Sequence, residues 1–384
     1  MTRPPLFRIF ARFLRLGLTA FGGPAMVPYI RAMAVDREGW LGEDAFRLGM
    51  GVCQLIPGAT AMQMAAYVGL RARGGPGALA AYLGFGLPAF LLMAGLSEFY
   101  FSAHGTPAVA AAFGGLQLVV IALILHAAIN FARRYLDTLA AKLLASLAGI
   151  WLGLGGDPIP ALAAICVLAL FVCRDEAGGA AVAEVPPVAG RPLLSALVFL
   201  AGLLLFLGLL ALASPKLLDL GALMVKIDCF AYGGGYVSVP LMLHEVVEAR
   251  GWLTGAQFMD GIALGQVTPG PIVMTGAFVG YAVAGLAGAV AATVAVFSPS
   301  LIFLCAAAPF ADRLIRSPLA RRALRGSLVS LVGLMAAVAA RFLVSVHWGP
   351  AEIAVGLAAF VALRRGVDVL WVILAGAAVS ALLL

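Results

Sequence analysis

The sequence predicts an all-α polytopic membrane protein, made of two inverted-topology repeats with broken or re-entrant helices. First, 63% of its 384 residues are hydrophobic and only 11% are charged, whereas about 25% of a soluble domain is charged. Second, apolar stretches long enough to cross a bilayer recur from end to end. Third, the same glycine and proline motifs occur twice, about 211 residues apart.

Six apolar segments are expected in the first half and six in the second, with an additional one at 192–213. They lie at about 9–30, 45–70, 77–100, 107–132, 139–154 and 158–173, and at about 219–243, 257–283, 285–310, 324–346, 350–363 and 367–384. This division predicts a first repeat at 1–175, a polar linker with one inverting helix at 176–216, and a second repeat at 217–384. Up to thirteen crossings result, or fewer if the first two segments of each half are re-entrant hairpins.

The loop charges predict opposite orientations for the two halves. Arg71 and Arg73 occupy the second connection of the first half, whereas the matching connection at 281–288 has no Lys or Arg. The third connections show the reverse pattern, because 97–106 has no Lys or Arg and 313–325 is rich in Arg. Basic loops prefer the cytoplasm. A cytoplasmic N-terminus places most of the 25 Lys and Arg residues on that side.

Matching interruptions of the apolar segments identify the expected substrate site. Phe21-Gly22-Gly23-Pro24 answers Tyr232-Gly233-Gly234-Gly235, and the Pro-Gly pair at 57–58 answers that at 269–270. Backbone freed by a break within the membrane is tolerated only if protein buries it or it lines a water-filled cavity. The next half-helix then points its amide groups and positive dipole end at the cavity, which suits an anion. Paired breaks of this kind indicate a transporter's binding site.

The candidate substrate-binding residues lie in the breaks, follow them closely, or carry positive charge. They are Arg15, Gly22, Gly23, Gln54, Pro57, Gly58, Thr60, Gln63, Lys226, Gly233, Gly234, Gly235, Gln266, Thr268, Pro269, Gly270 and Thr275. The glycines permit close ligand approach, the two prolines suit the first turn of the following half-helix, and Gln and Thr side chains donate hydrogen bonds. The two cations occupy equivalent positions and attract anions. The alternatives are helix packing by glycine, kinking by proline, headgroup contact by Arg15, and pairing of Lys226 with Asp228.

Other charged residues are expected to be peripheral. Arg8 and Arg12 share a helix face that suits anionic lipid. Four acidic residues near Trp40 and Trp252 are interpreted as solvated loop charges, with proton carrying as the alternative: Glu43, Asp44, Glu245 and Glu248. The sequence has no phosphate-binding P-loop, nucleophile elbow or metal-spaced His/Cys cluster. Neither a catalytic residue nor a metal or cofactor is therefore expected. The net charge of +7 is explained by the loops, so no nucleic-acid partner is inferred.

Together these motifs resemble the chromate ion transporter family in its long, two-domain form, over nearly the whole chain. The motifs that carry the resemblance are Phe21-Gly22-Gly23-Pro24, Trp40-Leu41, Gln54 with Pro57-Gly58, Ala61-Met62-Gln63, Tyr67-Val68-Gly69, Gly233-Gly234-Gly235-Tyr236-Val237, Pro240-Leu241 and Gly265-Gln266-Val267-Thr268-Pro269-Gly270-Pro271. The resemblance implies export of chromate across the cytoplasmic membrane, driven by an ion or proton gradient, and hence chromate resistance. One departure is Ala59, where the first half of the family usually has a second proline, often followed by an acidic residue. This departure leaves open how transport is coupled.

The sequence therefore predicts a secondary active transporter for an oxyanion, chromate first and sulfate as the alternative. A channel for the same ions is the second hypothesis. An integral membrane enzyme acting on a lipid phosphate ranks below both, because it needs an acid, base or nucleophile beside the anion site. The expected partners are the oxyanion and membrane lipid, and a homodimer is left open.

Overall fold

The computed structural model describes residues 4–19, 26–103, 107–172, 185–186, 188, 190–232 and 235–383, and in these ranges the chain forms helices, turns and loops with no strand. Five helical stretches among them are long and apolar enough to cross a membrane: Thr60–Ala103, Phe113–Tyr135, Pro192–Ala213, Ile272–Arg316 and Pro318–Ser345. The predicted class, an all-α polytopic membrane protein, is confirmed. The predicted motif at 21–24 and Gly233-Gly234 lie outside the described residues.

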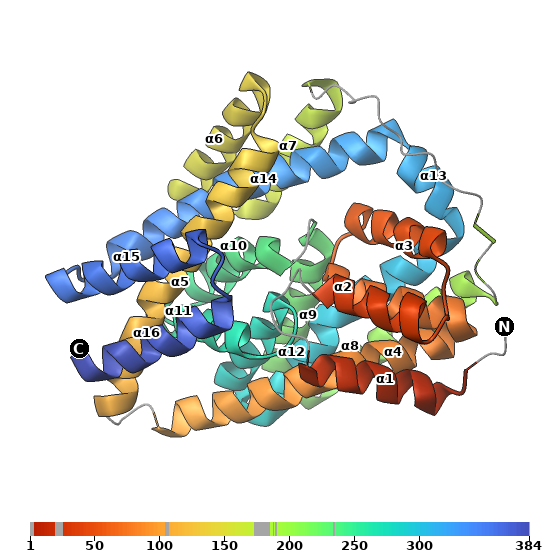
Figure 1. Cartoon of the computed structure of the whole chain (residues 1–384), viewed down its shortest axis with the longest axis horizontal. Coiled ribbons are helices and arrows are strands. Elements are labelled where there is room, and N and C mark those ends of the chain that lie inside the picture. The colour runs from red at the N-terminus through yellow and green to blue at the C-terminus, as the bar shows by residue number, and fades with distance from the viewer. Residues whose placement is uncertain are drawn as a thin grey trace. The chain divides into compact units, whose positions relative to one another are not determined.

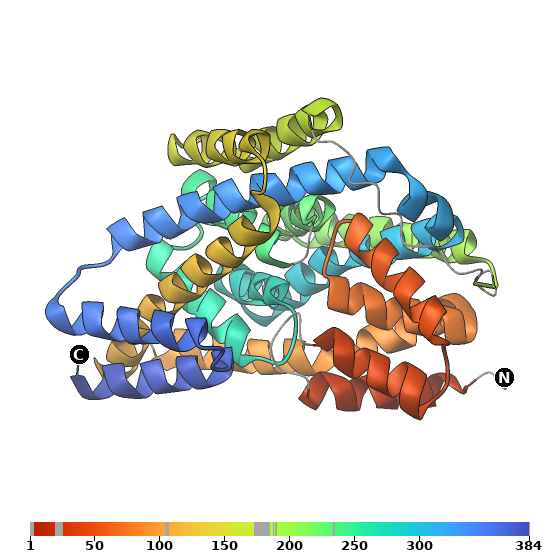
Figure 2. The same cartoon turned by 45° about the horizontal axis from the view of Figure 1, so that its top comes forward.

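The chain forms two compact units, and each is assembled from both halves of the sequence. Unit 1 comprises Met1–Ala94, Asp175–Ser238 and Thr268–Arg321, and unit 2 comprises Gly95–Arg174, Val239–Val267 and Arg322–Leu384. Figures 1 and 2 show the helices of both units coloured along the chain.

Unit 1 contains the predicted breaks and most of the helices around them. Its elements from the first half are α1 (Leu6–Thr19), α2 (Met26–Arg31), the π-helix η2 (Ala32–Arg37), α3 (Glu43–Leu55) and most of α4 (Thr60–Ala103). Those from the rest of the chain are α8 (Pro192–Ala213), α9 (Pro215–Phe230), the 3₁₀ helices η3 (Gly235–Val237) and η5 (Ile272–Met274), α12 (Thr275–Ala307), η6 (Ala308–Phe310) and α13 (Ala311–Arg316). Helix α12 packs against α8 and α9, and α3 packs against α13.

Unit 2 is built around α5 (Pro107–Tyr135), which packs against α11 (Gly255–Val267), α15 (Pro350–Arg364) and α16 (Val369–Leu383). Helices α6 (Leu139–Gly153) and α7 (Pro158–Val172) lie side by side (Figures 1 and 2). The unit also contains α10 (Ser238–Met242), the π-helix η4 (Leu243–Ala249) and α14 (Pro318–Ser345). A Cβ at Gly333 of α14 would overlap the Ala145 carbonyl of α6, so α14 and α6 approach closely at this glycine.

Sharp turns divide both α4 and α12 into a short arm and a long arm. The backbone leaves the helical conformation at Arg73-Gly74 in α4 and at Ala284-Gly285 in α12. In α4 a Cβ at Gly69 would overlap the carbonyl of Gly77, so the arms form a tight antiparallel hairpin. The equivalent glycines of α12, at 280 and 288, are in the same contact. The predicted connections between the second and third apolar segments therefore lie at these turns.

Equivalent backbone geometry recurs along the two halves. Glycines with positive φ occur in pairs 211 or 212 residues apart, a conformation that other residues rarely adopt. The pairs are Gly39 and Gly251 (61° and 60°), Gly58 and Gly270 (119° and 146°), Gly74 and Gly285 (69° and 58°), and Gly155 and Gly366 (88° and 82°). Helices η2 and η4 also begin at equivalent positions. The motif repeat seen in the sequence thus corresponds to a repeat of local structure.

Candidate functional site

The first break lies at the tip of a helical hairpin in unit 1. Helix α3 ends at Leu55, and the buried residues 56–59 precede the start of α4 at Thr60. A Cβ at Gly49 would overlap the ring of Tyr67, so α3 and the short arm of α4 lie side by side. A straight helix would place these residues about 27 Å apart. The chain therefore folds back at the break, and the 13 residues of α3 span only about 20 Å of a hydrocarbon core about 30 Å thick.

Three hydrogen bonds fix the backbone of the first break. The Pro57 carbonyl accepts from Nε2 of the fully buried Gln63 at 2.5 Å. The Gly58 amide donates to the carbonyl of Ala231, which follows α9, at 3.0 Å. The Ala59 amide donates to Oγ of Ser300 in the long arm of α12 at 3.3 Å. Two backbone amides of the break are therefore already hydrogen-bonded within the protein. The amides in the first turn of α4 have no intrahelical acceptor.

A carboxylate and a hydroxyl, Asp228 and Ser300, are buried beside the first break. Both side chains are 0% exposed. Oγ of Ser300 lies 2.9 Å from Oδ1 and 2.7 Å from Oδ2 of Asp228, and the Ser300 amide donates to Oδ2 at 2.7 Å. Pro299 disrupts helical hydrogen bonding next to Ser300. A buried carboxylate needs such donors, since burial without them is costly.

This pair was missed by the sequence analysis. Asp228 was considered only as a partner for Lys226, and Ser300 was not considered. The available signal was an ionisable residue inside an apolar segment, which by itself marks a functional position in a membrane protein.

The second break, residues 268–271, is also in unit 1 but has different neighbours. A Cβ at Gly270 would lie 2.7 Å from Cβ of Ala89 in the long arm of α4. Gly235 packs against Ile272, and the buried Thr275 donates from Oγ1 to the Ile272 carbonyl at 2.8 Å. Thr268 is also buried. The position equivalent to Ser300 is thus Ala89, and the position 211 residues before Asp228 is Gly17.

The structure places some of the predicted site residues at the two breaks and others on helices outside them. Pro57, Gly58, Thr60 and Gln63 lie together at the first break, and Gly235, Thr268, Pro269, Gly270 and Thr275 lie at the second. Gln54 is exposed near the end of α3, and Gln266 is half-buried in α11. Arg15 is exposed on α1, and Lys226 is half-buried on α9.

The expected place of the two prolines is wrong. Pro57 and Pro269 are not in the first turn of the following helix, because α4 begins at Thr60 and η5 at Ile272. The reason is the glycine that follows each proline. Its positive φ is incompatible with a right-handed helix. The helix can begin only after it.

A cavity of about 420 Å³ lies between the long arms of α4 and α12 in unit 1. It is lined by equivalent residues of the two halves: Met62 and Met274, Leu79 and Val290, Tyr82 and Thr293, Leu83 and Val294, Gly86 and Phe297, Leu87 and Ser298, and Phe90 and Leu301, with Phe10 in addition. The lining is mainly apolar, so it offers little to an anion. The groups that suit an anion lie at the breaks.

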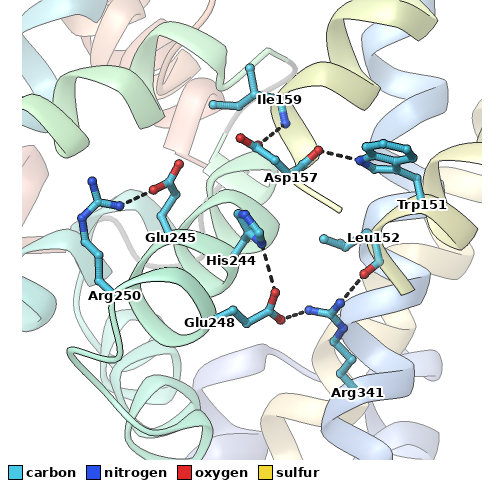
Figure 3. A network of polar contacts seen from close by, with 9 residues as sticks. All are labelled: Trp151, Leu152, Asp157, Ile159, His244, Glu245, Glu248, Arg250 and Arg341. Atoms are coloured by element: carbon cyan, nitrogen blue, oxygen red, sulfur yellow. Dashed lines mark hydrogen bonds and ion pairs between the residues drawn. The ribbon is translucent and has the colours of Figure 1, made fainter. Parts of the chain in front are cut away.

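Polar residues in and around η4 of unit 2 form a network (Figure 3). Oε2 of Glu248 lies 3.0 Å from Nδ1 of His244, and the same carboxylate pairs with Arg341 of α14. Arg341 also donates to the Leu152 carbonyl of α6. Glu245 pairs with Arg250. The interpretation of these two glutamates as solvated charges is therefore wrong, since Glu245 is buried and paired with the cap of η4 and Glu248 connects η4 to α14.

Two further carboxylates have partners that the sequence did not reveal. The side chain of Glu38 in unit 1 is buried and pairs with Arg8 at 2.8 Å and Arg12 at 2.6 Å. These two arginines are therefore bound to a carboxylate of the protein while their side chains remain partly exposed. Asp260 in α11 of unit 2 is buried and accepts hydrogen bonds from Tyr100 at 2.8 Å and Gln117 at 3.0 Å.

The fold and the paired breaks define a class, the polytopic helical membrane proteins built from two matching halves with interrupted helices. Within this class the chain belongs to the chromate transporter family, a family of membrane transporters. The profile of that family matches residues 7–174 and again residues 218–381.

Relatives in several organisms match most of the chain. An uncharacterized transporter of Methanocaldococcus jannaschii is 38% identical over 372 residues, which cover 97% of this chain and 92% of the relative. A chromate transport protein of Pseudomonas aeruginosa is 34% identical, covering 97% of this chain and 91% of the relative. A chromate transport protein of Cupriavidus metallidurans is 29% identical over 78% of this chain and 73% of its own length. No solved structure matches the chain.

Proposed function

We propose that this chain is a secondary active transporter that exports chromate, a tetrahedral dianion, across the cytoplasmic membrane, driven by an ion or proton gradient. Two observations support chromate as the substrate: the chain belongs to the chromate transporter family, and two of its relatives are named chromate transport proteins. The observation that carries the binding site is the buried break before α4, with the first turn of a helix directly behind it.

In this proposal the oxyanion binds at the start of α4. The amides of Thr60, Ala61 and Met62 form the first turn, and an anion there is favoured by these donors and by the positive end of the helix dipole. The Thr60 hydroxyl is half-buried at the same position and adds a donor. The second break contributes through Thr268, because the Thr275 hydroxyl already donates to the Ile272 carbonyl. Arg15 and Lys226 raise the local anion concentration.

The N-terminus is proposed to lie in the cytoplasm, with equivalent loops of the two halves on opposite sides of the membrane. Movement of one repeat against the other then exposes the oxyanion alternately to each side. Chromate binding in this scheme involves no covalent step, so an enzymatic function is not proposed.

Transport of labelled chromate into everted membrane vesicles tests the function, with sulfate as competitor and an uncoupler to remove the gradient. Accumulation against the gradient that the uncoupler abolishes is expected. Accumulation of sulfate alone would change the substrate, and purely downhill flux would indicate a channel. Turnover of a phosphorylated lipid by purified protein, without transport, would favour the enzyme.

The variant Thr60→Val tests the site, because it removes the hydroxyl and keeps the side-chain shape. We expect a loss of chromate affinity of about 10- to 100-fold, because a hydrogen bond to a charged group contributes about 1.5–3 kcal/mol. Thr293→Val is the matched control, since the Thr293 hydroxyl donates to the Ala289 carbonyl of its own helix at 2.7 Å. Equal transport by the two variants would contradict the proposed position of the oxyanion.

A further inference from the structure

We propose that Asp228 is a proton-binding site that controls oxyanion affinity at the first break through the hydroxyl of Ser300. This inference rests on the proposed function and adds a regulatory group to the same site. It starts from the three-membered chain Ala59 amide, Ser300 hydroxyl and Asp228 carboxylate, all within unit 1.

The hydroxyl hydrogen of Ser300 can be donated either to the Asp228 carboxylate or to a group bound at the first break. Its Oγ accepts from the Ala59 amide at 3.3 Å and lies within 2.9 Å of both Asp228 oxygens. A hydroxyl has a single hydrogen to donate. While Asp228 is ionised, that hydrogen is directed to the carboxylate, and the break receives only the lone pairs of Ser300.

The ionised state also places a negative charge close to the break. Asp228 is 0% exposed, and water therefore screens its charge weakly. A dianion next to Ala59 and Thr60 is repelled by this carboxylate. Ionised Asp228 thus opposes oxyanion binding in two ways, through its charge and through the hydrogen that it withdraws.

Protonation reverses both effects. The carboxyl group gains one O–H, which donates to Oγ of Ser300, and the Ser300 hydrogen is released to donate to an oxyanion at the break. The only net change is the uptake of one proton by Asp228. Proton binding and oxyanion binding therefore strengthen each other, and this linkage is reciprocal.

The neighbours of Asp228 identify it as the group that titrates. Helices α8 and α12 pack against α9, and the sequence of α8 contains no titratable side chain. On α4 and α12 the nearby titratable groups are Tyr82, whose hydroxyl donates to the Phe297 carbonyl at 2.7 Å, and Cys305. On α9 itself the nearby groups are Cys229 and Lys226. Phenol, thiol and ammonium groups ordinarily change charge at higher pH than a carboxyl group.

The test is the affinity of the purified full-length protein for sulfate and for chromate, measured by calorimetry between about pH 4 and pH 9. This range begins near the ordinary pKa of an aspartate, about 3.9, and extends over the values found for buried carboxyl groups. Sulfate is the primary probe because it remains a dianion throughout. We expect wild-type affinity to rise as pH falls, by up to about tenfold per pH unit, the limit for one linked proton. Asp228→Asn imitates the protonated acid, and it is expected to bind tightly with no pH dependence.

The matched control is Asp260→Asn, which neutralises another buried carboxylate and is expected to keep the wild-type pH profile. A second measurement needs no variant: sulfate binding in weak buffer is expected to take up as much as one proton per anion. A pH profile in Asp228→Asn like that of wild type, or binding without proton uptake, would overturn the inference while the transport proposal stands. Failure of wild type to bind either anion at any pH would instead overturn the proposed function.

Discussion

The two breaks of unit 1 share a backbone and differ in what surrounds them. Both follow a half-helix with Pro-Gly, and both place the glycine at positive φ. At the first break the opposing long arm supplies Ser300, supported by Asp228. At the second it supplies Ala89. The repeat therefore preserves the geometry of an interrupted helix, whereas Ala89 and Gly17 stand at the positions equivalent to Ser300 and Asp228.

This difference indicates separate roles for the two breaks. Backbone amides and a helix dipole are supplied by geometry alone, so both breaks can contact an anion. A group that changes charge must be encoded by a side chain, and a single copy is sufficient to link binding to one proton. Substitutions that exchange the features of the two breaks test this division.

The largest effect is expected for alanine at Gly58. The new Cβ would overlap the Ser300 hydroxyl, and φ of +119° adds strain of about 1–3 kcal/mol for a residue other than glycine. Gly58→Ala is expected to abolish chromate transport and lower the melting temperature in detergent. Gly270→Ala is expected to be milder, because its Cβ would meet only Ala89 at 2.7 Å.

Gly155→Ala provides the control for strain alone. Its φ is +88°, and a Cβ there would meet no atom within 4 Å. The expected order of melting-temperature losses is Gly58, then Gly270, then Gly155. A larger loss at Gly155 than at Gly58 would show that contact with Ser300 does not constrain the first break.

An intermediate effect is expected from exchanging the opposing residues. Ser300→Ala removes the donor proposed for the oxyanion, and a hydrogen bond to a charged group contributes about 1.5–3 kcal/mol, so sulfate affinity at low pH is expected to fall by about 10- to 100-fold. Ala89→Ser adds a hydroxyl at the second break and is expected to change affinity less than about twofold, because no carboxyl group there orients it. Calorimetry on both variants measures the difference. Equal losses would remove the distinction between the breaks.

The sequence predicted the interruptions well, for a local reason. A helix cannot continue through a proline followed by a glycine at positive φ. Pro57-Gly58 and Pro269-Gly270 therefore predict a break from local sequence alone. The same reasoning placed the two prolines too close to the next helix, because the preference of proline for a first turn was considered without the glycine after it.

The long-range contacts had no comparable signal. Asp228 and Ser300 are 72 residues apart, and each is an ordinary polar residue in an apolar segment until the fold brings them together. Arg8 and Arg12 share a helix face that fits lipid equally well, and only the position of Glu38 shows their partner. Charged side chains were therefore assigned least accurately, since periodicity gives their face but not their neighbour.

The smallest effect on stability is expected for an exposed carboxylate, Asp137, in contrast to the buried Asp228. In unit 2, Asp137 follows α5 in a loop, and NH2 of Arg325 lies 2.6 Å from each of its carboxylate oxygens. The hydrogen bond from Arg325 lowers the pKa of Asp137 below its usual value. Stability from this pair is therefore complete above the unfolded pKa of about 3.9, and it is lost as pH falls through the lower folded pKa.

Melting temperatures of wild type and Asp137→Asn between pH 7 and pH 3 test this contribution. At neutral pH the variant is expected to be slightly less stable, by roughly the 0.2–1 kcal/mol of an exposed ion pair, and the difference is expected to shrink toward the acidic end. High salt should reduce it at neutral pH, because water and ions screen a pair of which the aspartate is 43% exposed. A difference that grows as pH falls would contradict the sign, and it would show that Asp137 is favoured in its protonated form by the fold.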